Sequence, residues 1–84
     1  MSAQTLDAAG LVRVLVEPMI EHKDELEVIE SVLETGEILV EIDINEEDAG
    51  KVIGRQGRVI KSIRTLARAA ASRAGQRVEV ELVE

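Results

Sequence analysis

The feature that most constrains the fold is a pair of glycines, Gly54 and Gly57, set between two segments of helical character. Before them, Asn45 and the three acidic residues that follow it have the composition of a helix start. After them, residues 58–74 carry apolar side chains at helical spacing as far as Gly75, a suitable C-terminal cap. Glycines at both ends of a two-residue segment interrupt a helix, so two helices must meet in a tight loop at this point.

Two segments on either side of the helix pair have the alternating pattern of half-buried strands. Residues 38–44 and 77–83 both place apolar side chains at every second position. The side chains that we expect to face the core are Ile38, Val40, Ile42, Ile44, Val78, Val80 and Leu82. A strand, two helices and a further strand form a crossover, which should be right-handed and should make the two strands parallel.

The chain begins with a predicted helix over residues 5–21, with Thr5 or Asp7 as its N-cap and a kink at Pro18. The apolar run at residues 11–16 is interrupted by a charged side chain and is too short for a signal peptide or a membrane span. We therefore expect a cytosolic protein that has no membrane partner.

A second predicted strand lies at residues 26–33, where the alternation is imperfect. A β-bulge near Ile29 and Glu30 would explain the slip in period. A turn at Thr35-Gly36 joins this strand to the next one in a hairpin. The order helix, strand, strand, helix, helix, strand predicts a two-layer α+β sandwich, with helices on one face of a three-stranded mixed sheet.

Composition narrows the possible functions of this 84-residue chain, which is long enough for one domain with a small core. It has no cysteine, which excludes disulfides and thiolate zinc sites. It has no aromatic residue either, which excludes recognition by stacking bases on aromatic rings. The single histidine, His22, has no partner for a metal or nucleophilic site, and the carboxylates of residues 46–48 fit a helix start. We expect no enzyme, metal, cofactor or small-molecule substrate.

The net charge of −7 argues at first against nucleic acid as a partner, but the charges are segregated. Residues 1–48 hold 14 acidic and 2 basic side chains, a net charge of −12. Residues 49–84 hold 3 acidic and 8 basic side chains, a net charge of +5. The segregation indicates either one functional basic face or neutralisation of one segment by the other.

The glycine segment carries a family resemblance. The run Val52-Ile53-Gly54-Arg55-Gln56-Gly57, followed by Ile60, resembles the signature of the KH domain, an RNA-binding module. The element order is similar to the bacterial type II form, and the chain length is similar to the single-domain KhpA family. The resemblance extends over nearly the whole chain and is most specific from Asp48 to Leu66. Members often carry His-Pro after the first helix, where this chain has His22-Lys23.

The resemblance implies a single KH domain over residues 1–84, with a core at about 37–83 and a flexible start at residues 1–4. It implies that the loop grips about four unpaired nucleotides of single-stranded RNA. Glycine lets the backbone approach a phosphate closely, and the start of the second helix attracts an anion. The residues expected to bind RNA are Gly54, Arg55, Gln56, Gly57, Lys51, Arg58 and Lys61. Other glycine motifs do not fit, because the spacing of neither a P-loop nor a dinucleotide site is present.

The helix at residues 58–74 has two predicted faces. The apolar stripe expected over the sheet comprises Ile60, Ile63, Ala67, Ala70, Ala71 and Ala74. The opposite, polar face comprises Arg58, Lys61, Arg64, Thr65 and Arg68. This face is either a track for RNA or an ordinary solvated surface.

The shoulder of the apolar stripe offers a second hypothesis. Val59, Leu66 and Ala70 lie there, and we hypothesise a contact with another subunit centred on Leu66. The alternative is that Leu66 belongs to the core. The family resemblance implies homodimers, and heterodimers with a larger KH protein of the Jag (KhpB) type. It also implies a post-transcriptional regulator or RNA chaperone linked to cell shape. The alternative is an adapter that acts by pairing with the larger protein, with RNA binding secondary.

Overall fold

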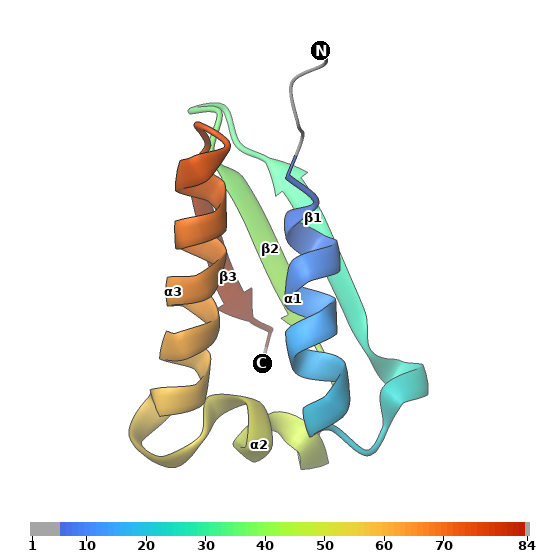
Figure 1. The fold of residues 1–84 in the computed structure, drawn as a ribbon. Helices are drawn as coiled ribbons and strands as arrows, with labels where there is room; N and C mark the ends of the chain where they lie inside the picture. The colour runs from blue at the N-terminus through green and yellow to red at the C-terminus, as the bar shows by residue number, and fades with distance from the viewer. Residues whose placement is uncertain (1–5, 84) are drawn as a thin grey trace.

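The predicted order of helices and strands is confirmed in the computed structural model, which describes residues 6–83 (Figure 1). The α-helices and strands are α1 (Ala8–Val16), β1 (Glu27–Val32), β2 (Ile38–Asp43), α2 (Ala49–Ile53), α3 (Arg58–Arg73) and β3 (Val78–Leu82). Short 3₁₀ turns are η1 (Glu17–Met19), η2 (Lys23–Glu25), η3 (Glu46–Asp48) and η4 (Arg55–Gly57). The flexible start expected at residues 1–4, and the alternative cap Thr5, lie outside the described residues.

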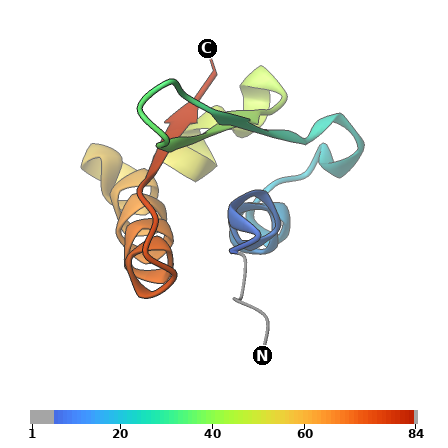
Figure 2. The ribbon, with the colours of Figure 1, turned by 90° about the horizontal axis from the view of Figure 1, so that it is seen from above.

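The three strands form one mixed sheet in the order β1-β2-β3. β1 pairs antiparallel with β2, whereas β3 pairs parallel with β2 on its other side. The parallel pair is connected through α2 and α3, as the predicted crossover requires. Seen from above, α1 and α3 both lie on the same side of the sheet (Figure 2). The two-layer α+β architecture is therefore confirmed.

The core between these layers is built from aliphatic side chains alone. The helices contribute Ala8, Val12, Val16, Val52, Ile60, Ile63, Ala67 and Ala71. The strands contribute Ile38, Val40, Ile42, Val78 and Val80, as their alternation predicts. Ile44 and Leu82 are half-buried against this cluster. Ala67 and Ala71 on the buried face of α3 are fully buried, so small side chains take the place of large ones where this helix meets the sheet.

The bulge predicted in β1 is wrong, because its residues pair with β2 in unbroken register. Glu30 pairs with Val40, whose side chain is buried under the helices, so Glu30 lies on the helix side of the sheet. Its carboxylate accepts a hydrogen bond of 3.1 Å from the backbone N–H of Ala9 in the first turn of α1. Ile29 consequently lies on the uncovered face, where its side chain is exposed. A helix-capping carboxylate explains the irregular alternation.

The first helix is shorter than predicted. Asp7 is its N-cap and accepts from the N–H of Gly10 at 2.9 Å. The α-helix ends at Val16, and Pro18 lies in the 3₁₀ turn that follows. The chain then becomes extended at Ile20, whose side chain is buried. The expected kink is therefore the end of the helix.

The last helix ends in a left-handed cap at Gly75, which has a φ of 72°. The N–H of Gly75 donates to the carbonyl of Ser72 at 3.1 Å, and that of Gln76 donates to Ala71 at 2.8 Å. These two bonds form a Schellman motif, which satisfies carbonyls at the end of the helix. Ala74, predicted in the apolar stripe, is exposed instead because it is already the C-cap.

Candidate functional site

The loop between α2 and α3 has an unusual backbone. Gly54 has φ 75° and ψ 174°, Gln56 has φ 58° and ψ 23°, and Gly57 has φ 74° and ψ 15°. Three of four consecutive residues thus have positive φ, a region that side chains other than glycine rarely adopt. The predicted tight loop is confirmed, and its shape is set by the backbone conformation of these three residues.

The two glycines have different roles in this loop. An added Cβ on Gly54 would lie 2.8 Å from Cβ of Val59, so only glycine allows α2 and the first turn of α3 to pack this closely. The φ and ψ of Gly54 also belong to a region occupied almost only by glycine. At Gly57 the nearest atom is Cε of Lys61, at 3.9 Å, so that position is open to the outside. Gly54 therefore holds the loop to the fold, and Gly57 leaves its outer surface uncovered.

Three cationic side chains surround the outer surface of the loop. Arg55 and Arg58 are exposed, and an Nη of Arg58 donates to the side-chain carbonyl of Gln56 at 3.2 Å. Lys61 extends toward Gly57 from the first turn of α3. Within residues 6–83, no carboxylate lies within ion-pair distance of these three side chains. The structure thus brings together the loop and three of the four cations predicted to act with it.

The fourth predicted cation, Lys51, is engaged elsewhere. Its Nζ lies 3.2 Å from a carboxylate oxygen of Glu21 and 3.4 Å from one of Asp48. The hydrogen bond to Glu21 raises the pKa of Lys51 most, and the Asp48 carboxylate raises it further against the opposing effect of burial. Lys51 is therefore charged but already paired with two carboxylates.

Asp48 is a structural residue that the sequence analysis did not single out. Its side chain is 1% exposed and accepts hydrogen bonds of 3.0 Å from the backbone N–H groups of Glu21 and His22. Burial raises the pKa of Asp48, but these two hydrogen bonds and Lys51 together hold it below its ordinary value. The contacts fasten the segment after α1 to the start of α2, and so support the helix that carries the loop. Only its shorter side chain distinguishes Asp48 from its acidic neighbours in the sequence.

His22 and the other acidic residues at the helix start also make local contacts. The imidazole lies 2.9 Å from a carboxylate oxygen of Glu47 and 3.4 Å from one of Glu25. Asn45 accepts from the N–H of Glu47 at 2.8 Å, which confirms it as the predicted cap. Among residues 6–83, no group of three or more histidine or carboxylate side chains is arranged to hold a metal ion.

Three adjoining hollows, which share lining residues, follow the contact between α3 and the free edge of β3 from the end of α2 onward, and together we call them the α3–β3 groove. Its loop end is lined by Ile53, Ile60, Arg64, Glu81 and Leu82. Its middle adds Lys61, Thr65, Arg68, Glu79 and Val80. Its far end continues past Arg68 and Glu79 to Ser72, Gln76, Arg77, Val78 and Glu37. The floor at the loop end is aliphatic, and the walls are charged.

Arg64 does not lie on the polar face of α3, where the sequence pattern predicted it. On a helical projection it lies about 20° from the buried Ala71, at the border of the apolar stripe. Its side chain is half-buried, and its Nε donates to the carbonyl oxygen of Val80 at 2.9 Å. That carbonyl is on the unpaired edge of the sheet. The bond fixes the guanidinium in the groove. Helical spacing gives the border position of Arg64, but not its acceptor, which lies 16 residues along the chain.

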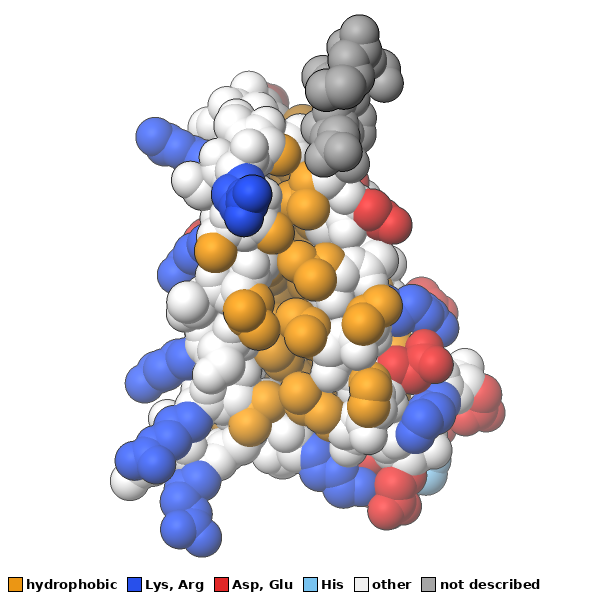
Figure 3. Space-filling view, viewed as in Figure 1, with side chains coloured by type: hydrophobic (Ala, Val, Ile, Leu, Met, Phe, Trp, Pro, Cys, Tyr) orange, Lys and Arg blue, Asp and Glu red, His pale blue; other side chains and the backbone are white. Residues whose placement is uncertain are grey.

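An uncovered apolar surface lies on the opposite side of the molecule from the sheet. In Figure 3, hydrophobic side chains gather over α1 and α3, with basic side chains along the outer margin of α3. We call this surface the α1–α3 apolar face. Helical spacing places on it the exposed Val14 and Leu66 and the half-buried Leu11, Leu15, Val59 and Ala70. Val14 is 70% exposed and Leu66 is 52% exposed. The alternative that Leu66 belongs to the core of the single chain is therefore wrong.

The described part of the chain contains no helix with the length and hydrophobicity needed to cross a bilayer.

Comparison with known proteins gives consistent matches. A profile of the KH domain of KhpA and KhpB matches residues 9–82. The RNA-binding protein KhpA of Clostridium perfringens is 38% identical over 73 residues, covering 87% of this chain and 96% of that protein. KhpA of Clostridium acetobutylicum is 41% identical over 75 residues, with the same coverage. KhpA of Leifsonia xyli is 41% identical over 70 residues, covering 83% of this chain and 88% of that protein.

Among solved structures, the chain is similar to part of Era. One match is Era in complex with MgGDPNP and nucleotides 1506–1542 of 16S ribosomal RNA, with a TM-score of 0.60 and 23% identity. It covers 89% of this chain and 28% of the Era chain. Era of Aquifex aeolicus bound to GDP and aluminium fluoride has the same TM-score and identity. At this identity, the likeness indicates a shared fold and nothing further.

The buried carboxylate predicts a specific acid sensitivity of the fold. Because the folded state lowers the pKa of Asp48 below its ordinary value of 3.8, its stabilisation is complete above that value and is lost as pH falls through the lower folded-state pKa. Asp48→Asn should therefore lower the Tm at neutral pH, and the difference from wild type should shrink in strong acid. Melting followed by circular dichroism measures this, with Glu46→Gln as an exposed control. A difference in Tm that is independent of pH would contradict the assignment.

Proposed function

The chain belongs to the KhpA/KhpB family of KH domains, and from this premise we propose that it binds single-stranded RNA along the α3–β3 groove. In this proposal the loop of residues 54–57 holds the phosphate backbone, and the bases lie against the groove. KH domains of this family bind RNA and are not enzymes. The protein would act as a post-transcriptional regulator or RNA chaperone in the cytoplasm.

The observation that carries the proposal is the open start of α3 behind the loop. Within the described residues, no side chain caps this N-terminus, and the first turn of α3 contains no acidic residue. The positive end of a 16-residue helix therefore faces outward, where Gly57 leaves room for a phosphate. Arg55, Arg58 and Lys61 add positive charge at the same place. This combination favours a phosphate group of a nucleic-acid backbone.

The groove beyond the loop favours unpaired bases. Its aliphatic floor at Ile53, Ile60 and Leu82 can contact the flat faces of bases without aromatic stacking. The unpaired edge of β3 and the fixed guanidinium of Arg64 offer hydrogen-bonding groups beside that floor. KH domains clamp about four nucleotides in this way. Ile60 is mostly buried, so it supports the floor more than it lines it.

The residues predicted to bind RNA stay in the proposal, but we expect a smaller contribution from Lys51 and add Arg64. Gly54, Arg55, Gln56, Gly57, Arg58 and Lys61 form one continuous surface and remain the proposed site. Lys51 is paired with Glu21 and Asp48, so we expect it to contribute less. Arg64 joins the set through its position in the groove. With four cations facing RNA, the logarithm of the affinity should fall with the logarithm of the salt concentration with a slope of about −3.

Replacing both residues between the glycines tests the proposed clamp. Arg55→Asp with Gln56→Asp places two carboxylates where the phosphate would lie, and aspartate tolerates the left-handed backbone of position 56. We expect RNA binding, measured by fluorescence anisotropy with a labelled unstructured RNA, to be lost while the circular dichroism spectrum is retained. Ser31→Asp with Arg73→Asp makes the same change of charge on exposed positions away from the loop. Equal affinities for wild type and the folded loop variant would contradict the clamp.

A second candidate function is assembly with another copy of this chain through the α1–α3 apolar face. The six side chains that define this face are uncharged although the whole chain carries −7, so two copies that meet through them bring few like charges together. The predicted interface residues Val59, Leu66 and Ala70 are all on it. We propose a homodimer on this surface; a partner of the Jag (KhpB) type would use the same face.

Leu66→Asp tests this interface. Leu66 is half-exposed in the single chain, so aspartate there should leave the fold intact but put charge into the contact. Sedimentation or light scattering should show a dimer for wild type and a folded monomer for the variant. Thr65→Asp, an exposed neighbour on the polar side of α3, is the control. A wild-type protein that is monomeric at high concentration would contradict the homodimer.

The same variants separate an RNA-binding protein from an adapter. If RNA binding is the main function, the loop variant should lose cellular function and the Leu66 variant should lose it only where RNA binding needs the dimer. If pairing is the main function, the loop variant should keep activity and the Leu66 variant should lose it.

A further inference from the structure

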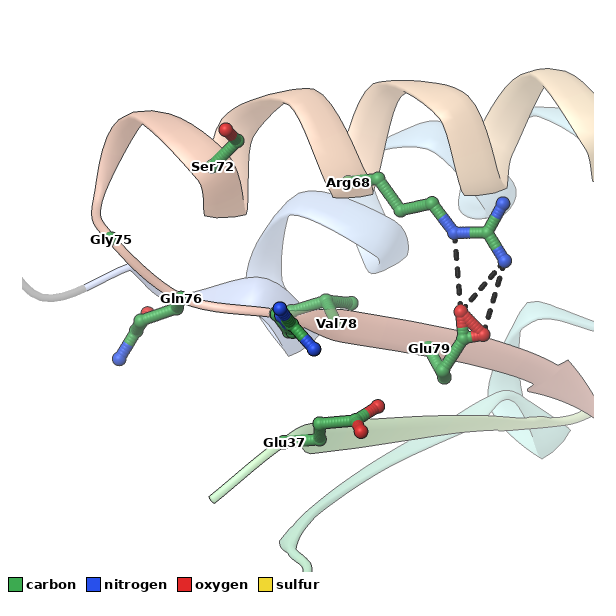
Figure 4. Close-up of a pocket in the computed structure, with 8 residues that line it drawn as sticks. Glu37, Arg68, Ser72, Gly75, Gln76, Val78 and Glu79 are labelled. Atoms are coloured by element: carbon green, nitrogen blue, oxygen red, sulfur yellow. Dashed lines mark hydrogen bonds and ion pairs between the residues drawn. The ribbon is translucent and has the colours of Figure 1, made fainter. Parts of the chain in front are cut away.

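The middle of the α3–β3 groove is crossed by one ion pair. Nε and an Nη of Arg68 lie 3.1 and 2.6 Å from one carboxylate oxygen of Glu79, and the same Nη lies 3.0 Å from the other. Figure 4 shows the two side chains reaching toward each other from α3 and β3. Both are about half exposed, so they lie at the surface that an RNA strand would follow.

The pair divides the groove into two parts of different charge. On the loop side, the cations are Arg55, Arg58, Lys61 and Arg64, and the one carboxylate lining the groove is Glu81. On the far side, Arg68 and Arg77 are matched by Glu37 and Glu79. The loop side therefore carries a net charge of +3, whereas the far side is neutral.

Arg64 and Arg68 show why this division matters. They are one helical turn apart, a separation of about 6 Å along α3. Arg64 donates to a neutral carbonyl and keeps its full positive charge for a phosphate. Arg68 donates to a carboxylate in a bidentate arrangement, and its charge is neutralised within the chain.

We infer that Glu79 ends the RNA track on α3 and limits the affinity of the groove by holding Arg68. The inference rests on the proposed RNA-binding function. A phosphate beyond Arg64 must compete with the Glu79 carboxylate for the guanidinium, and the carboxylate itself repels it. The bound strand is thereby confined to the loop half of the groove, and RNA longer than that half gains no further ionic contact on α3.

Glu79→Gln tests the inference, because glutamine keeps the size of the side chain and removes the charge. Freed Arg68 should add one phosphate contact, which steepens the logarithmic salt slope by about 0.7 and tightens binding about three- to fivefold near physiological salt. Glu27→Gln, an exposed carboxylate of β1 on the other edge of the sheet, makes the same change of net charge and should leave the salt slope unaltered. The pair is exposed, so both variants should remain folded.

Arg68→Gln completes a double-mutant cycle. In the wild-type background it leaves the Glu79 carboxylate unpaired, so RNA affinity should fall. The salt slope should stay the same, because Arg68 contacts no phosphate there. In the Glu79→Gln background it should abolish the gain. A shallower salt slope for Arg68→Gln alone, a gain that persists in the double variant, or an unchanged affinity and slope for Glu79→Gln would overturn the inference.

The experiments distinguish a failure of the Glu79 inference from a failure of the proposed RNA-binding function. If wild type binds no single-stranded RNA, or if the loop variant binds as well as wild type, the RNA-binding groove itself is contradicted. If wild type binds and the loop variant does not, while Glu79→Gln matches Glu27→Gln, only the role of Glu79 fails.

Discussion

The close contact between Gly54 and Val59 is the constraint on which the rest of the structure depends. It lets α2 turn into α3 within four residues, and it needs a backbone conformation that glycine alone adopts readily. Because α3 starts there, its buried face of isoleucine and alanine meets the sheet and its N-terminus faces outward. The same contact therefore fixes both the core and the orientation of the proposed phosphate site. Asp48 supports it from the other side by fastening α2 to the segment after α1.

Electrostatics explain how an acidic protein can present a basic groove. The acidic side chains lie mainly on the segment after α1, the hairpin and the turn before α2, whereas most of the cations follow α3. Figure 3 shows basic side chains along the outer margin of α3. Negative charge elsewhere on the surface disfavours RNA there, so we expect the proposed binding to be confined to the α3–β3 groove. Within that groove, Glu79 and Glu81 reduce the attraction further. The expected result is modest affinity that is strongly dependent on salt.

Local sequence signals were sufficient to predict the helices and strands and their order along the chain. Asn45, Asp7 and Gly75 act as caps where their residue types predict, and the alternation of residues 38–44 identified the central strand. The loop was also predictable, because its glycines and their neighbours are contiguous in sequence. For the caps and the loop, the interacting residues are at most a few positions apart.

The features that sequence reasoning missed depend on contacts between distant segments. Glu30 caps a helix 21 residues earlier, which produced a false bulge. Asp48 accepts hydrogen bonds from backbone amides 26 and 27 residues away. Lys51 forms ion pairs with Asp48 and with the distant Glu21. The pairing of Arg68 with Glu79 requires knowing how α3 lies across β3. A helical pattern gives the direction of a side chain, but the partner it meets comes only from the tertiary structure.

The most direct test of the account is a map of amide chemical shifts, recorded on isotope-labelled protein as a short unstructured RNA is added. The account predicts that the largest shifts occur at residues 54–61, followed by the loop half of the α3–β3 groove, with α1 and β1 unaffected. Shifts concentrated on the uncovered face of the sheet or on the α1–α3 apolar face, with the loop unaffected, would contradict it.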